Sequence, residues 1–142
     1  MKIIHTSTSQ HLLAFEIGDE VMTGLKSYAT ETGLKSAWVN ILGASKEVTL
    51  AFYDLEKKEY RTKTFDEELE IVTVVGNITW FNGEIAVHLH GSFGREDMSL
   101  VGGHIMNMKI SATGETHLQL MDEMIERAHC NRTGLNLMRC KG

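Results

Sequence analysis

Short segments rich in β-branched and aromatic residues, separated by glycine or charged turns, dominate the chain and predict β-strands. A first pair lies at 2–7 and 10–17, with a turn near 7–9. The later strand-like segments are 36–42, 47–53, 60–65, 69–81, 84–93, 100–109 and 116–121. Asn82-Gly83 stands between two of them and is a strong signal for a tight hairpin. The pattern therefore predicts a largely antiparallel sheet.

One segment has helical rather than strand-like spacing. Its apolar residues fall on one face of a helix: Val21, Leu25, Tyr28 and Ala29. Asp19 stands where its side chain can cap the free N–H groups of the first turn, and Gly33 stands where a glycine commonly ends a helix. The segment 122–129 is compatible with a helix or a strand, and Met124, Ile125 and Ala128 favour a helix. We therefore predict one main helix after the first strand pair.

Length and composition fit one globular domain with one core. The chain has 142 residues, of which 42% are hydrophobic and 23% are charged, close to the values of ordinary globular domains. No repeat, low-complexity segment or linker divides it. Together with the predicted elements, this indicates a single α+β domain over residues 1–142, with a mostly antiparallel sheet and one main helix.

Charge and cysteine content narrow the setting and the partners. The chain has 14 Lys and Arg against 19 Asp and Glu, a net charge of −5, which suits a phosphate backbone poorly. No segment resembles a signal peptide or approaches the ~18 apolar residues of a membrane span. Two cysteines, Cys130 and Cys140, are too few for a disulfide scaffold. We therefore expect a cytoplasmic protein that does not enter a membrane.

Three of the seven histidines stand in an ordered arrangement. His88 and His90 flank Leu89, so on a strand both imidazoles point to the same face. The segments 84–93 and 100–109 could form an antiparallel hairpin. One register would then place His104 opposite His88, and a register shifted by two residues would place it opposite His90. An odd register, or a bulge at the neighbouring glycines, would separate the three rings.

Three convergent imidazoles are suited to a divalent metal, with zinc the first candidate, because a neutral ring nitrogen binds zinc at ~2.0–2.1 Å. Iron, nickel, copper and manganese remain alternatives. Three protein ligands leave one tetrahedral position for water or a small molecule, as in catalytic zinc sites. Gly91, Gly102 and Gly103 flank the cluster and leave room for such a ligand. The simpler alternative is that these are ordinary hydrogen-bonded sheet histidines.

Other candidate groups have simpler interpretations. Glu96 and Asp97, near the histidines, could accept a proton, but a solvated turn is the simpler interpretation. A basic segment consists of Lys57-Lys58 and 61–63, interleaved with Tyr60. The acidic residues Glu56 and Glu59 interrupt it, which favours a solvated hairpin over a phosphate site. The remaining histidines have no comparable arrangement and are expected to be surface or core residues: His5, His11, His117 and His129.

Ten short motifs, in their order and spacing, carry a resemblance over nearly the whole chain. They are Gly18-Asp19-Glu20, 36–39, 41–44, 48–50, 70–72, 76–78, His88-Leu89-His90, 101–104, Arg127 and Thr133-Gly134-Leu135. The chain resembles the PPC (plants and prokaryotes conserved) domain. The resemblance implies an α+β fold with a main antiparallel sheet, a homotrimer, and a metal site at His88, His90 and His104.

The resemblance also bears on DNA. Eukaryotic relatives carry this domain behind AT-hook motifs, but this chain has no such motif, and acidic residues at 67–68 replace a Gly-Arg pair of the plant members. We expect a trimeric, metal-binding module that is related to DNA-binding regulators and acts by interaction. The alternative is a metal-dependent enzyme that acts on a small polar molecule at the three histidines.

Overall fold

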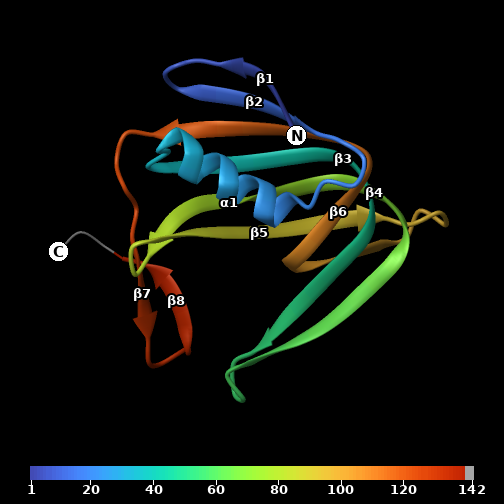
Figure 1. Ribbon diagram of the computed structural model, residues 1–142. Helices are drawn as coiled ribbons and strands as arrows, with labels where there is room; N and C mark the ends of the chain where they lie inside the picture. The colour runs from blue at the N-terminus through green and yellow to red at the C-terminus, as the bar shows by residue number, and fades with distance from the viewer. Residues whose placement is uncertain (140–142) are drawn as a thin grey trace.

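Within residues 1–139, which the computed structural model describes, the chain forms eight strands and one helix (Figure 1). The elements are β1 (Lys2–Thr6), β2 (Gln10–Phe15), α1 (Val21–Thr32), β3 (Ser36–Asp54), β4 (Glu59–Phe81), β5 (Glu84–Gly94), β6 (Leu100–Met121), β7 (Arg127–Cys130) and β8 (Leu135–Met138). Six strands form one antiparallel sheet in the order β1-β2-β6-β3-β4-β5. The predicted α+β fold is thus confirmed, while Cys140 lies outside the described residues.

Helix α1 packs on one face of this sheet, with the predicted apolar stripe buried. Val21, Leu25 and Ala29 are fully covered, and they join sheet residues such as Val39 and Leu118 in one hydrophobic core. Gly33 ends the helix at a left-handed φ of 65°, which costs little for a residue without a side chain. Among the described residues, no helix has the length and apolar character to cross a membrane.

The start of the helix differs from the prediction by one residue. Glu20, not Asp19, is the N-cap, and its carboxylate accepts hydrogen bonds from the backbone N–H groups of Met22 and Thr23 at 3.0 and 2.7 Å. Asp19 instead accepts from the backbone N–H of Glu16 at 2.8 Å. The longer Glu20 side chain also accepts from the backbone N–H of Met108 at 3.1 Å, so the cap joins the helix to β6.

Several predicted strands are halves of longer ones. The segments 36–42 and 47–53 form the single strand β3, and β4 and β6 likewise each merge two predicted segments. The expected breaks are β-bulges, where the pairing register shifts. At one of them Gly43 lies so close to β6 that a Cβ would stand 1.9 Å from the carbonyl oxygen of Thr113. A glycine therefore bends the strand here without ending it.

Strands β3, β4, β5 and β6 form a closed arrangement at the end of the sheet away from β1. Strand β3 pairs with both β4 and β6, and β5 also pairs with both β4 and β6. The first part of β6 therefore lies between β5 and β3, with His104 opposite both His90 and Ala51. This closure brings together residues from separate strands on the face that α1 does not cover.

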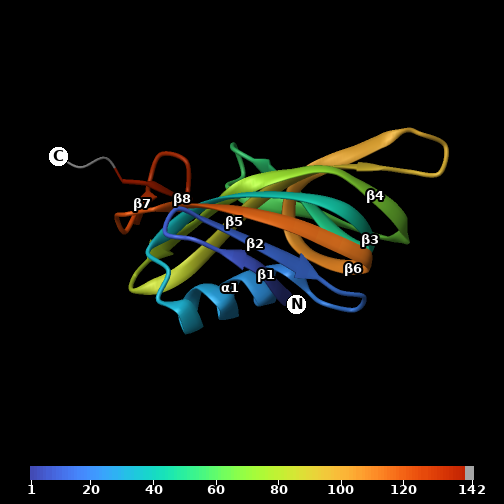
Figure 2. The ribbon, with the colours of Figure 1, turned by 90° about the horizontal axis from the view of Figure 1, so that it is seen from above.

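The C-terminal hairpin lies on the side of the sheet opposite α1 (Figure 2). Segment 122–129, compatible by sequence with either element, contains the start of β7, and the pairing strand β8 has no counterpart in the sequence prediction. The backbone N–H of Trp80 donates to the carbonyl of Ile125, and the backbone N–H of Ile125 donates to Ser36 Oγ, at 2.9 and 2.8 Å. These bonds fix the hairpin to the ends of β3 and β4.

Candidate functional site

The three predicted histidines meet on the face that α1 leaves uncovered. His90 lies directly opposite His104, which is the second of the two predicted registers, and His88 lies two residues earlier on the same face of β5. The ring centroids are 5.1–5.2 Å apart, and the ring nitrogens that could bind a metal all lie within 4.8 Å of one another. One chain alone therefore supplies the whole cluster.

The spacing of His90 and His104 fits a tetrahedral metal. Two ligands at ~2.0–2.1 Å from a tetrahedral ion stand about 3.3–3.4 Å apart. His90 Nε2 and His104 Nδ1 are 3.4 Å apart, so the backbone already holds these two donors at the required separation. At this distance one ring can also donate a weak N–H hydrogen bond to the other, with a proton that a metal ion would replace.

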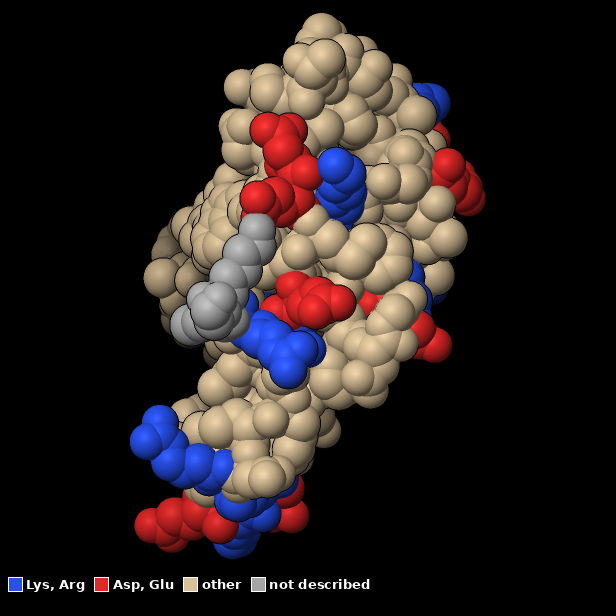
Figure 3. Space-filling view, turned by 90° about the vertical axis from the view of Figure 1, so that its left-hand side faces the viewer, with Lys and Arg blue, Asp and Glu red and all other residues tan. Residues whose placement is uncertain are grey.

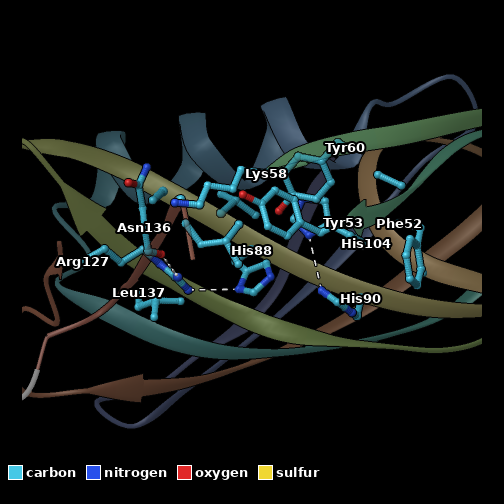
Figure 4. Close-up of a pocket in the computed structure, with 16 residues that line it drawn as sticks. Phe52, Tyr53, Lys58, Tyr60, His88, His90, His104, Arg127, Asn136 and Leu137 are labelled. Carbon is cyan, nitrogen blue, oxygen red and sulfur yellow. Dashed lines mark hydrogen bonds between the residues drawn. The ribbon is translucent and has the colours of Figure 1, made fainter. Parts of the chain in front are cut away.

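His88 is held by an arginine as well. The Nη2 of Arg127 lies 3.1 Å from His88 Nδ1 (Figure 4). A guanidinium has donors only, so Arg127 donates and His88 Nδ1 accepts. A neutral imidazole has only one ring nitrogen with a free lone pair, and in His88 that nitrogen accepts from Arg127. A metal ion would also need a ring lone pair, so Arg127 and the metal compete for His88. The donor set fits zinc in residue type, and His90 and His104 also fit it in spacing, whereas His88 would have to exchange its hydrogen bond for the metal.

The surroundings keep two of the rings neutral. Burial, followed by the charge of Arg127 and the two neighbouring rings, lowers the pKa of His88 to about 4. Burial, then His90 and Arg127, also lowers the pKa of His104. At neutral pH both rings are therefore unprotonated bases, the form that binds metals.

Arg127 is itself fixed by a network of neutral acceptors. Its Nε donates to Thr79 Oγ1, its Nη2 to Asn77 Oδ1 and its Nη1 to the carbonyl of Asn136, each at 2.8 Å. None of these partners carries a negative charge, and Arg127 has no ion pair with any described carboxylate. Within residues 1–139 the guanidinium is thus held by neutral acceptors, and no carboxylate pairs with its positive charge.

An aromatic hairpin tip forms the opposite side of the site. Tyr60 stacks on His104 with ring centroids 5.0 Å apart, and Tyr53 lies 4.8 Å from Tyr60. The hydroxyl of Tyr53 donates to the carbonyl of Thr133, and Lys58 Nζ donates to the carbonyl of Asn131, at 2.8 and 2.7 Å. The β3–β4 tip therefore leans onto the turn between β7 and β8.

A cavity of about 820 Å³ lies between these walls and the histidines (Figure 4). Its lining comes from the β3–β4 tip, β5, the start of β6 and the C-terminal hairpin: Ala51, Phe52, Tyr53, Lys58, Tyr60, Ala86, Val87, His88, His90, Gly103, His104, Arg127, Gly134, Leu135, Asn136 and Leu137. Two of these residues are cationic at neutral pH, and none is acidic. The cavity thus joins a candidate metal site to a positively charged, largely apolar space.

The residues near the histidines in the sequence do not all reach the cavity. Glu96 and Asp97 do not line it, and Asp97 accepts hydrogen bonds from Ser99 within the exposed β5–β6 turn, which agrees with the simpler interpretation of a solvated turn. Of the glycines expected to leave room for a ligand, Gly103 lines the cavity. Gly91 instead makes space for core residues, since a Cβ there would lie 2.8 Å from both Phe93 and Val74.

The basic hairpin is also more than a solvated turn. Lys58 and Tyr60, from the segment interpreted as solvent-exposed, both line the cavity. The predicted strand segments 47–53 and 60–65, which end and begin at these tyrosines, could have indicated that Tyr53 and Tyr60 pair across a hairpin, as they do. No local pattern indicates that this tip folds back onto the histidines, or that Arg127 joins them from β7.

The comparisons with known proteins agree with this fold. The model of the Plants and Prokaryotes Conserved (PCC) domain matches residues 4–121. A crystal structure from Bacteroides thetaiotaomicron, described as a candidate DNA-binding protein, is 30% identical with a TM-score of 0.93 and covers 97% of this chain and 96% of its own. A search of curated proteins gave no match.

Two archaeal structures are also similar. A metal-containing protein from Archaeoglobus fulgidus is 29% identical, with a TM-score of 0.85 over 98% of this chain and 99% of its own. A plant- and prokaryote-conserved (PPC) protein from Pyrococcus horikoshii is 26% identical, with a TM-score of 0.86 over 99% of this chain and 95% of its own. With the family model matching most of its length, this chain belongs to the Plants and Prokaryotes Conserved domain family.

Proposed function

We propose that this protein binds a divalent metal, zinc, at His88, His90 and His104, and acts as an interaction module. The observation that carries the proposal is the convergence of three imidazoles from two strands, with His90 and His104 at 3.4 Å. The similar protein from Archaeoglobus fulgidus is described as metal-containing, which supports the same conclusion. When bound, the ion would supply a positive charge and an open coordination position for a small ligand.

We further propose that the module is a homotrimer. Exposed apolar side chains lie on the sheet face opposite α1 and form what we call the outer face: Leu12, Trp38, Leu42 and Val75. Trp38 is 41% exposed and Leu42 is 56% exposed. Such side chains, grouped across β2, β3 and β4, favour contact with other copies of the chain. Val75 of this outer face pairs with His90 on the neighbouring strand β5. An assembly that covers the outer face would therefore also cover the sheet beside the histidines.

DNA has no direct part in this proposal, although a similar structure is described as a candidate DNA-binding protein. The net charge is −5. On the face shown in Figure 3, Lys and Arg side chains alternate with Asp and Glu and form no continuous basic stripe. Phosphate backbones are bound through clustered cations. Proteins or small molecules are therefore better partners for this chain.

The second candidate function is a metal-dependent enzyme that acts on a small polar molecule. The observation that favours it is the cavity of about 820 Å³ beside the histidines, because catalytic zinc sites keep one position open to such a space. The lining contains no carboxylate that could act as a general acid or base. We therefore favour binding over turnover.

The metal is tested by elemental analysis of protein purified without a histidine tag. We expect about one zinc per chain in the wild type, since one three-histidine site holds one ion. His90→Ala and His104→Ala should each reduce the zinc content at least tenfold, because two imidazoles bind zinc far more weakly than three. His5→Ala is the matched control, since His5 is exposed on β1, away from the cluster.

The variants must be folded for this comparison, which circular dichroism establishes. Zinc well below one equivalent in the wild type, after incubation with zinc and dialysis, would refute the metal proposal. So would equal zinc contents in the wild type and in His104→Ala.

A further inference from the structure

We propose that the cavity beside the histidines is a binding site for a small organic carboxylate. Arg127 and Lys58 attract its charged group, and Phe52 and Tyr60 contact its apolar body. The inference deepens the proposed function and rests on it, because the same histidines line the cavity. It names the class of small molecule that this module would bind.

The size and shape of the cavity suit a small ligand. Binding pockets for small molecules usually measure about 300–1,000 Å³ and combine apolar walls with a few placed polar groups. The cavity measures about 820 Å³. Its walls come from three parts of the chain that are distant in sequence, and hydrogen bonds from Tyr53 and Lys58 to the β7–β8 turn hold these parts together. The space is therefore built by the fold rather than left between loose segments.

The charged side chains of the lining favour an anion. Lys58 and Arg127 are the residues of the lining that are cationic at neutral pH, and the lining holds no Asp or Glu. Neither cation forms an ion pair with a carboxylate among residues 1–139. Burial lowers the pKa of Arg127 from its ordinary value, yet a guanidinium stays charged at neutral pH. A partly buried charge without a counterion favours an anionic ligand.

Much of the cavity wall is apolar. The rings of Phe52, Tyr53 and Tyr60 and the side chains of Leu135 and Leu137 line the same space. Phe52 is 66% exposed and Tyr60 is 39% exposed, so both rings are available to a ligand. A simple inorganic anion would leave this surface uncovered. A carboxylate with a flat or aliphatic body would cover it and gain hydrophobic stabilisation.

The experiment compares benzoate with benzamide by isothermal titration calorimetry at low ionic strength, on metal-free and zinc-loaded protein. The two probes have nearly the same shape, but only benzoate is charged. We expect the wild type to bind benzoate about tenfold more tightly than benzamide, the preference that a charge-assisted contact gives. Lys58→Gln and Arg127→Gln should each remove most of this preference.

Lys57→Gln is the matched control. Lys57 lies on the same turn as Lys58 and is exposed, but it does not line the cavity, so the benzoate preference should persist. Arg127→Gln removes bonds within the fold, and circular dichroism shows whether that variant is folded. Lys58→Gln changes an exposed turn residue and should fold. If Arg127→Gln does not fold, the benzoate preference of Lys58→Gln tests the carboxylate site by itself.

Equal binding of benzoate and benzamide by the wild type would overturn the inference. An unchanged preference in Lys58→Gln would overturn it too, as would inorganic phosphate that competes as well as benzoate. A preference seen in metal-free protein that takes up no zinc supports the carboxylate site while refuting the metal. Zinc uptake without any benzoate preference supports the metal and refutes the carboxylate site.

Discussion

At the scale of single residues, the site depends on how the ring nitrogens of His88 are used. Arg127 donates to Nδ1 of this ring at 3.1 Å, and a metal ion would require a ring lone pair. His90 and His104 face each other at 3.4 Å without such a competitor. We infer that these two histidines bind the metal first and that His88 completes the site by exchanging a hydrogen bond. Arg127 thus couples the metal site to the cavity wall.

The depressed pKa of His88 predicts how the stability of metal-free protein depends on pH. The pKa falls from 6.5 to about 4 in the folded chain, so between these pH values the unfolded chain binds a proton that the folded chain excludes. Stability therefore rises with pH in this window and is lost as the pH falls from about 6.5 toward 4. Urea unfolding of metal-free protein at a series of pH values measures the effect.

The contribution of His88 is separated from other acid effects by a variant. His88→Gln should have a flatter dependence than the wild type over this window, whereas His5→Gln should match the wild type. If the wild type and His88→Gln lose stability in parallel between pH 6.5 and 4, the lowered pKa of His88 is refuted.

At the scale of elements, the cavity exists because the β3–β4 hairpin contacts the turn before β8. Gly134 makes this contact possible, since a Cβ there would lie 2.7 Å from the hydroxyl oxygen of Tyr53 and 3.2 Å from Lys58. Gly134 also has a φ of 76°, a conformation that is unfavourable for residues with a side chain. A single glycine therefore permits two hairpins, distant in sequence, to enclose one space.

Gly134→Ala should separate the two hairpins and open the cavity. The left-handed backbone alone should lower the free energy of unfolding by about 1 kcal/mol, and the contact with Tyr53 should add to this loss. Gly83→Ala is the matched control, because Gly83 has a φ of 80° but open space around its Cβ position. It should lose a similar ~1 kcal/mol from the backbone term without affecting the cavity.

Hydrogen–deuterium exchange distinguishes the two substitutions. In Gly134→Ala the backbone amides near Tyr53 and Tyr60 should exchange faster than in the wild type, while in Gly83→Ala they should not. Equal exchange in both variants would show that the contact at Gly134 does not hold the hairpin tip.

At the scale of the whole molecule, the outer face is the surface that other copies are expected to cover. We predict a particle of three chains in analytical ultracentrifugation. Trp38→Glu should shift it toward the single chain, because a charge would have to be buried among apolar side chains. Ile17→Glu is the control, since Ile17 is 72% exposed but lies before α1, away from the outer face. A wild-type protein that sediments as one chain would refute the trimer.

The sequence alone predicted the fold class and most of the elements. Helix α1 followed from its apolar face and from Gly33, and the strands followed from their β-branched composition, because both signals are local. The joining of segments into β3, β4 and β6 was missed, since a glycine or charged residue resembles a strand end whether it terminates pairing or forms a bulge.

For the site, the sequence determined that His88 and His90 share a face, since alternation along a strand requires it. It also identified two registers that would bring His104 to them, but it left open an odd register or a bulge that would separate the rings. Only the tertiary structure selected the register opposite His90, because pairing along a whole hairpin is a cooperative outcome of packing. Only the tertiary structure brought Arg127 and Lys58 to the histidines, since contacts between distant segments depend on how the complete chain closes and leave no local pattern.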